Sequence, residues 1–121
     1  MKNLTTRNWL EYCKTETRDR VRNGSRSVQF SKGALVHQIG DVADAIYFIE
    51  EGGIRFNATS DEGKELIIRD LEAGEWFGFI GCFGSGFRPN DAITLIESKL
   101  RVVSRGDLER IGTNDPALWR A

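Results

Sequence analysis

The stretch EWFGFIGCFGSGFRPNDA, residues 75 to 92, carries the residue types that could contact a ligand. It contains four Phe, one Trp and four Gly, and it closes on Arg88, Pro89, Asn90 and Asp91. Glycine lets a backbone approach an anion closely, and an arginine adds a charge-assisted hydrogen bond. Aromatic side chains could instead stack on bases or fill a core. Three interpretations are therefore open: a phosphate cradle, a base-stacking surface or a core strand.

Few residues elsewhere in the chain suit catalytic or metal chemistry. His37 is the single histidine, and metal sites or nucleophile–base pairs usually need more. We interpret it as a strand residue with an ordinary partner. Cys13 and Cys82 form no C-x-x-C pair, the spacing typical of zinc and redox sites. We therefore expect two buried, apolar cysteines, no metal and no enzyme activity.

The composition is that of one ordinary globular domain. A chain of 121 residues suits a single domain, so we expect residues 1–121 to form one. The formal net charge is −1, whereas a domain that binds nucleic acid through its own surface is usually basic. No apolar run approaches the ~18 residues of a membrane span, and the first residues lack a secretory signal. We expect a cytoplasmic protein without membrane contact.

The elements that must position this stretch are mostly short strands. Residues 5–22 predict a helix, with Thr6 as a cap and Asn23-Gly24 at its end. Strand patterns then recur at roughly ten-residue spacing, each followed by a turn. They are SVQF, ALVHQI, AIYFIE, IRFNAT, KELIIRDL, AITLIE and KLRVV. This spacing predicts an all-β sandwich or barrel.

Two hairpins and a doubly covered strand follow from the same pattern. Asp61-Glu62-Gly63 predicts a hairpin between IRFNAT and KELIIRDL, and AITLIE with KLRVV predicts another. AIYFI is apolar at successive positions, which indicates a strand with both faces covered.

Helices return at the end of the chain. Ser104 stands three residues before Asp107 and predicts a helix cap. Asn114, Asp115 and Pro116 predict the start of a second helix, which the end at Ala121 is expected to cut short. The expected divisions are an N-terminal helical segment (1–24), a β-roll (28–104) and truncated C-terminal helices (105–121).

An ordered series of motifs resembles the cyclic nucleotide-binding domain of the Crp/Fnr family of bacterial transcription regulators. The series is F-S-K-G at 30–33, G-D at 40–41, I-Y-F-I-E-E-G at 46–52, D-E-G-K-E at 61–65, G-E-W-F-G at 74–78, R-P-N-D-A at 88–92 and D-P-A-L-W-R-A at 115–121. The resemblance covers about residues 28–121. It implies a mainly β fold, an antiparallel double-stranded β-helix of jelly-roll type with flanking N- and C-terminal helices.

The resemblance also implies a ligand site. In that family the stretch at 75–92 is the phosphate-binding cassette, in which F-G-E ends a strand, a helical turn follows, and an arginine with a neighbouring hydroxyl closes over the cyclic phosphate. Unpaired N–H groups at a helix start favour an anion. Carried over, the backbone donors are Gly78, Ile80 and Gly81, and the anion partner is Arg88. Phe79 and Asn90 would set selectivity. The full implied set is Gly78, Phe79, Ile80, Gly81, Arg88, Pro89, Asn90 and Asp91.

The chain departs from the family pattern at the ligand contacts. F-G-E reads Phe77-Gly78-Phe79, so the ribose-binding glutamate is missing, and Arg-Ser/Thr-Ala reads Asn90-Asp91-Ala92. R-P-N-D-A resembles an R-T-H-D-A variant, in which Arg88 remains two positions earlier. At roughly 1.5–3 kcal/mol per charge-assisted contact, the losses amount to about two to four decades of affinity. We expect no tight cyclic AMP binding. A cyclic nucleotide, another small anionic effector or no ligand remain open.

Three other functions compete with the leading interpretation. FGFI resembles part of an RNA-recognition strand, but Glu75 and Trp76 precede it where basic and glycine residues are wanted. A cupin-type enzyme shares a β-roll but needs several histidines. A stand-alone module of this fold could serve protein interaction without nucleotide. The leading interpretation is the effector-sensing domain of a Crp/Fnr-like regulator. Such a regulator would contact DNA only through a further C-terminal domain and would form a homodimer through its C-terminal helix.

Overall fold

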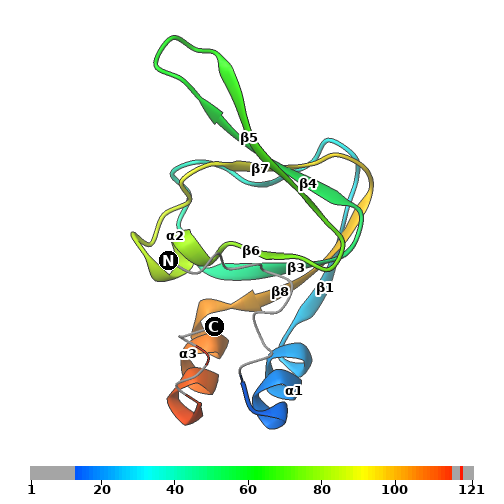
Figure 1. Cartoon of the computed structure of the whole chain (residues 1–121), viewed down its shortest axis with the longest axis vertical. Helices are drawn as coiled ribbons and strands as arrows, with labels where there is room; N and C mark the ends of the chain where they lie inside the picture. The colour runs from blue at the N-terminus through cyan, green and yellow to red at the C-terminus, as the bar shows by residue number, and fades with distance from the viewer. Residues whose placement is uncertain (1–12, 116–117, 119–121) are drawn as a thin grey trace.

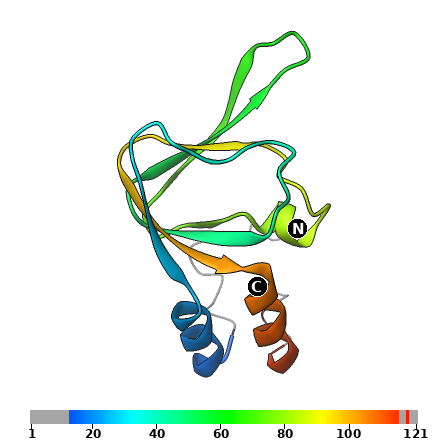
Figure 2. The same cartoon turned by 180° about the vertical axis from the view of Figure 1, so that it is seen from behind.

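The chain folds as a β-roll flanked by helices (Figures 1 and 2). The computed structural model describes residues 13–115 and 118. Two four-stranded antiparallel sheets run in the orders β1-β8-β3-β6 and β2-β7-β4-β5. The elements are α1 (Thr15–Asn23), β1 (Arg26–Phe30), β2 (Leu35–His37), β3 (Ala45–Glu51), β4 (Gly53–Thr59), β5 (Glu65–Glu72), β6 (Trp76–Phe77), α2 (Phe79–Phe83), β7 (Asp91–Thr94), β8 (Ser98–Ser104) and α3 (Arg105–Asn114). The predicted mainly β, jelly-roll-like fold is confirmed.

Two apolar clusters fill the fold on opposite faces of β3. Ile49 and Phe77 lie in the cluster between the two sheets. Ile46 and Val103 lie in the other cluster, which the helices cover. Leu108 of α3 is a member of this second cluster. Because side chains of a strand alternate between faces, β3 contributes to both clusters. This confirms the expectation that the AIYFI segment is covered on both sides.

The predicted hairpin between AITLIE and KLRVV is wrong. β7 pairs with β2 and β4, whereas β8 pairs with β1 and β3 in the other sheet. The chain crosses between the sheets at residues 95–97. The Leu95 amide donates to the Gly53 carbonyl at 2.9 Å, and the Ser98 hydroxyl donates to the Ile96 carbonyl at 2.8 Å. Neighbouring strands of a jelly roll commonly belong to opposite sheets.

The first helix is shorter than predicted within the described part of the chain. Cys13 and Lys14 precede α1, and Lys14 has an extended backbone (φ −59°, ψ 150°). The predicted cap Thr6 lies outside the described residues. The carboxylate of Asp115 instead accepts from the Lys14 amide at 3.0 Å and from the Thr17 hydroxyl at 2.7 Å. Asp115 thus joins the start of α1 to the end of α3. The second helix predicted from Pro116 also falls largely outside the described residues.

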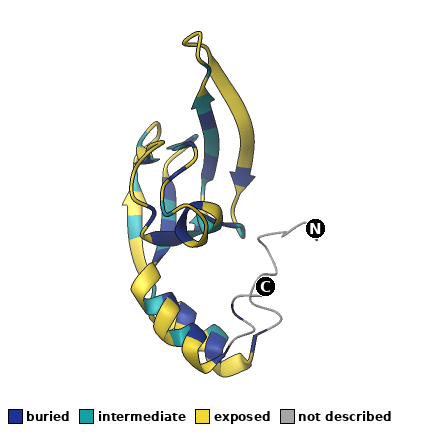
Figure 3. Cartoon of the chain, turned by 90° about the vertical axis from the view of Figure 1, so that its left-hand side faces the viewer, coloured by how far each residue is buried: buried dark blue, intermediate teal, exposed yellow. Residues whose placement is uncertain are grey.

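Other local predictions are confirmed. The Ser104 hydroxyl caps α3 by accepting from the Asp107 amide at 3.1 Å, and both cysteines are buried and free. β4 and β5 form the predicted hairpin, which projects beyond the roll (Figure 1). Much of β5, the outer strand of this hairpin, is exposed (Figure 3). Its residues Leu66, Ile67 and Ile68 are each more than half exposed. Over the described ranges, no helix is long and apolar enough to span a membrane.

Candidate functional site

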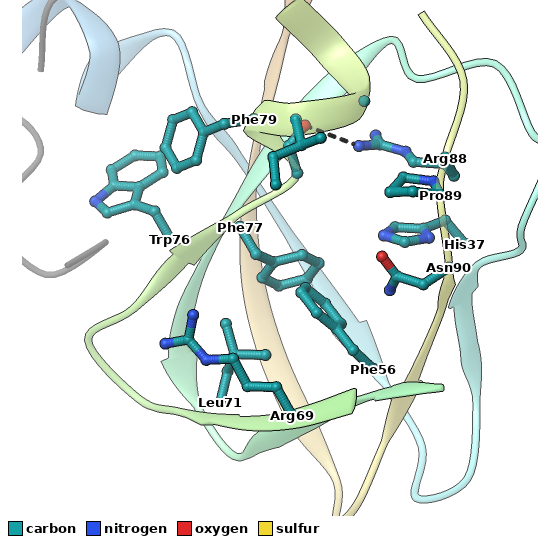
Figure 4. A pocket seen from close by; sticks show the side chains of 13 residues that line it. His37, Phe56, Arg69, Leu71, Trp76, Phe77, Phe79, Arg88, Pro89 and Asn90 are labelled. Atoms are coloured by element: carbon teal, nitrogen blue, oxygen red, sulfur yellow. Dashed lines mark hydrogen bonds between the residues drawn. The ribbon is translucent and has the colours of Figure 1, made fainter. Parts of the chain in front are cut away.

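A cavity of about 250 Å³ lies next to α2 and opens between the two sheets (Figure 4). Its lining comes from β2, β4, β5, β6, α2 and the segment before β7: His37, Phe56, Arg69, Leu71, Trp76, Phe77, Gly78, Phe79, Ile80, Gly81, Arg88, Pro89 and Asn90. All the ligand residues predicted from the sequence lie in this set except Asp91. The stretch at 75–92 is therefore neither a continuous strand nor remote from a cavity.

Gly78 and Gly81 are required by packing inside the protein. Gly78 has φ +101°, a conformation that residues with a Cβ rarely adopt, and an added Cβ would stand 2.9 Å from Arg88 Nη1. An added Cβ on Gly81 would stand 2.9 Å from the Phe87 carbonyl oxygen. These glycines let α2 sit directly against β3 and the segment before β7. Their predicted part as backbone donors to a ligand stays a prediction.

Arg88 is buried, and its side chain links the start of α2 to β3 through hydrogen bonds. Its side chain is 3% exposed. Nη2 donates to the Ala45 carbonyl at 2.7 Å, and Nη1 donates to the Gly78 carbonyl at 3.1 Å (Figure 4). The guanidinium carbon also lies 5.4 Å from the centre of the Tyr47 ring. Two of the donors that could hold an anion are thus used within the protein, and the predicted anion contact of Arg88 stays a prediction.

Asp91 and Asn90 make hydrogen bonds within their own segment and with the segment that follows β2. The Asp91 carboxylate accepts from the Ile39 amide at 2.7 Å, which fixes this charge at the end of β2. The Asn90 side-chain amide is buried and donates to the Asp91 carbonyl at 2.8 Å. Asn90 also lines the cavity, so it is one of the polar residues beside any ligand there.

The two predicted residues of α2 differ in exposure. Ile80 is 79% exposed, and its side chain borders the mouth of the cavity. Phe79 is partly buried and packs on the apolar cluster beneath the helices, on the Trp76 side in Figure 4. The residue that replaces the family's glutamate is therefore part of an apolar wall.

His37 is a cavity residue that the sequence did not indicate. It ends β2 and is 7% exposed. Its ring centroid lies 6.2, 6.3 and 6.1 Å from those of Tyr47, Phe56 and Phe77. Nδ1 is buried and has no hydrogen-bond partner among the described residues. The ring has an ordinary partner nonetheless, because a backbone hydrogen bond with Asn90 acts to raise its pKa. A lone histidine in an alternating strand carries no local signal of this position.

Burial, and to a smaller extent the charge of Arg88, together lower the pKa of His37 to about 4. The imidazole is therefore neutral at pH 7. Because an unfolded histidine titrates near 6.5, the unfolded chain binds more protons between about pH 4 and 6.5. Protonation thus favours the unfolded state as the pH falls through this window.

We expect His37 to contribute a loss of about 3 kcal/mol in the free energy of unfolding between pH 7 and pH 4, at about 1.4 kcal/mol per pKa unit. Urea denaturation at several pH values measures it. His37→Phe removes the titrating group and should flatten the dependence between pH 7 and 5, where carboxylates contribute little. Equal slopes in both proteins would contradict the assignment.

Residues 27–115 match the family model described as the cyclic nucleotide-binding domain. The chain belongs to this family. The cavity of this cyclic nucleotide-binding domain is lined by residues 76–81 and 88–90, within the segment that resembles a phosphate-binding cassette. The resemblance stated from the motifs is thereby confirmed at the level of the domain.

Two relatives contain a segment similar to this chain. The cAMP-activated global transcriptional regulator CRP of Haemophilus influenzae is 38% identical over 56 residues, which cover 46% of this chain and 25% of that protein. The cAMP/cGMP-dependent 3',5'-cAMP/cGMP phosphodiesterase B of Dictyostelium discoideum is 31% identical over 108 residues, covering 86% and 10%. The matched segment is thus a quarter or less of these two proteins.

Solved structures agree on the fold. The N-terminal domain of a transcriptional regulator from Streptomyces coelicolor A3(2) has a TM-score of 0.83 at 26% identity and covers 95% of this domain and 85% of its own chain. The Thermus thermophilus Catabolite Activator Protein has a TM-score of 0.84 at 21% identity, covering 93% and 53%. The second likeness supports the fold alone.

Proposed function

We propose that this domain senses a small effector for a Crp/Fnr-like transcription regulator and binds cyclic AMP only weakly. The observation that carries the proposal is the cavity beside α2, which collects seven of the eight residues implied by the cassette resemblance. Concave, mostly apolar sites with a few polar groups are typical of small-molecule binding. Here the polar groups are those of His37, Asn90 and the two arginines that line the cavity.

Three features support weak cyclic nucleotide binding. Phe79 packs in an apolar wall where the family has its ribose-binding carboxylate. Arg88 donates to two backbone carbonyls. Arg69, the other arginine of the cavity, pairs with Glu75 at 2.9 Å. A cyclic phosphate and a ribose would therefore find fewer free partners than the family pattern provides.

Calorimetric titration with cyclic AMP and cyclic GMP tests the proposal. We expect dissociation constants no tighter than about 100 μM, because roughly two to four decades of affinity are lost with the two contacts. The CRP of Haemophilus influenzae, titrated in the same buffer, shows that the nucleotide stock and the instrument respond. A micromolar or tighter constant for this domain would contradict the proposal.

A stand-alone interaction module without nucleotide is the second candidate. The exposed Leu66, Ile67 and Ile68 of β5 favour it, since contiguous exposed apolar residues often mark an interaction site. The reading frame separates the two candidates. Under the regulator proposal it continues beyond Ala121 into a long helix, which would form a homodimer, and into a DNA-binding helix-turn-helix. That regulator would act in the cytoplasm and have no enzyme activity of its own.

A further inference from the structure

β5 is an edge strand that exposes adjacent apolar side chains. It stands last in the sheet order β2-β7-β4-β5, so β4 pairs with one of its edges, and no strand of the described residues pairs with the other. Figure 1 shows it along the hairpin that projects beyond the roll. Leu66, Ile67 and Ile68 are each more than half exposed. An apolar strand edge with unpaired N–H and C=O groups is a template for another strand.

The outer part of this hairpin has few neighbours to stabilise it. β7 pairs with residues 54–57 of β4. Ala58 and Thr59 pair with Leu66 and Glu65 and, among the described residues, with no third strand. A two-stranded ribbon is marginally stable in water, whereas three or more strands with an apolar face are stable. A strand added to the free edge of β5 would supply the third strand and cover the apolar residues.

The charges that flank these apolar residues are complementary to those of a second copy of the same strand. The sequence reads K-E-L-I-I-R-D from 64 to 70. In two antiparallel copies with Ile67 opposite Ile67, Glu65 stands opposite Arg69. Lys64 then stands opposite Asp70, and two-fold symmetry makes both pairs occur twice. Opposite charges in cross-strand pairs stabilise a sheet.

The neighbouring registers and a parallel arrangement bring like charges together. A shift by one residue in one direction sets Lys64 opposite Arg69, and a shift in the other direction sets Glu65 opposite Asp70. Two parallel copies in register set every charged residue opposite itself. Like charges directly opposite each other are destabilising. The charge order therefore favours one register and a partner of identical sequence.

The two charges that follow the apolar residues are held in place but remain accessible. Asp70 accepts hydrogen bonds from Arg55 at 2.7 and 2.8 Å, and Arg69 pairs with Glu75 at 2.9 Å. The side chains of Asp70 and Arg69 are each about half exposed, so each can contact a further opposite charge. A side chain that is already ordered loses less conformational entropy on association.

We propose that two copies of this chain associate through β5, antiparallel and centred on Ile67. The contact lies outside the helices and does not depend on which effector the cavity binds. The register of β5 against β4 shifts between Phe56 and Asn57, which places a bulge at Ile68. A bulge bends and twists a strand, so the contact is short. Small contacts of this kind are weak and transient.

Sedimentation equilibrium of the whole chain at low ionic strength tests the proposal. We expect the average mass to rise from that of a monomer at ~10 μM toward that of a dimer at ~1 mM, because a small contact corresponds to a dissociation constant on the order of 100 μM. Amide chemical shifts of residues 64–70 should change over the same concentrations and locate the contact.

Charge reversals assign the association to this register. Glu65→Lys sets two positive charges opposite each other, and Arg69→Glu sets two negative charges, so each variant alone should associate about tenfold more weakly. An equimolar mixture of the two variants restores opposite charges in both pairs and should associate within about threefold of the unaltered chain. Glu97→Lys, the same substitution at an exposed residue between β7 and β8, is the matched control and should associate like the unaltered chain.

Urea denaturation confirms that each variant is folded before masses are compared. A chain that stays monomeric up to ~1 mM would overturn the proposal in favour of a different protein as the partner of β5. Association that Glu65→Lys leaves unchanged would overturn it in favour of another surface. A mixture that associates no better than its two components would overturn the antiparallel register.

Discussion

Replacing Arg88 with Ala is expected to lower the free energy of unfolding by about 3 kcal/mol. Arg88 is 3% exposed, and its guanidinium donates to the carbonyls of Gly78 and Ala45. The variant removes both hydrogen bonds, although the Gly78 carbonyl keeps the Cys82 amide as a donor at 3.1 Å. A hydrogen bond to a charged group contributes about 1.5–3 kcal/mol. The void left by the side chain adds to the loss. Urea denaturation at pH 7 measures the effect.

Arg20→Ala is the matched control. Arg20 lies on α1 and pairs with Glu16 at 2.6 Å, with about half of its side chain exposed. Exposed pairs of this kind contribute about 0–1 kcal/mol, so this variant should unfold close to the unaltered protein. Arg88→Lys should fall between the two, because an ammonium group can keep one of the carbonyl contacts. If Arg88→Ala lowers the free energy of unfolding no more than Arg20→Ala does, the hydrogen bonds of Arg88 do not stabilise the packing of α2 on β3.

Most of the strands could be predicted because the signals for them are local. Short apolar-rich runs, each followed by a turn, place β1, β3, β4 and β5 within a residue or two of their observed bounds. The partners of the last two strands could not be predicted the same way. A turn signal says that the chain reverses, but it does not say which sheet the next strand joins. The sheet is decided by the closure of the whole roll.

The position of the site was predictable, whereas its contacts were not. The ordered motifs indicated that residues 77–92 form the cassette, and the cavity lies there. Arg88 hydrogen-bonds to β3, 43 residues away in sequence. This contact depends on tertiary packing, so no local signal predicts it. The same holds for Asp115, which bonds to Thr17 across 98 positions. His37 was overlooked because its neighbours in the cavity come from strands far along the chain.

Restoring the two missing contacts is expected to create cyclic AMP binding. Phe79→Glu returns a carboxylate for a ribose hydroxyl, and Phe79 is only partly buried, so a charged side chain can reach water without ligand. Asn90→Arg returns a guanidinium at a cavity position that, unlike Arg88, is not already bonded to the Gly78 and Ala45 carbonyls. At roughly 1.5–3 kcal/mol per charge-assisted contact, the double variant should gain about two to four decades of affinity.

Each single variant serves as a control for the other. Phe79→Glu or Asn90→Arg alone should gain about one to two decades, because each restores one contact. Denaturation of the variants confirms that they are folded before affinity is compared. Ile80→Glu is a further control: Ile80 is largely exposed at the rim, so this variant adds a carboxylate to α2 away from the implied ribose position and should give no gain.

Calorimetric titration of cyclic AMP into the unaltered domain and into the Phe79→Glu, Asn90→Arg double variant is the most direct test. We expect a dissociation constant no tighter than about 100 μM for the unaltered domain and at least a hundredfold gain in the variant. Micromolar binding by the unaltered domain, or a folded double variant that binds no better, would contradict the account of an altered cyclic nucleotide cassette.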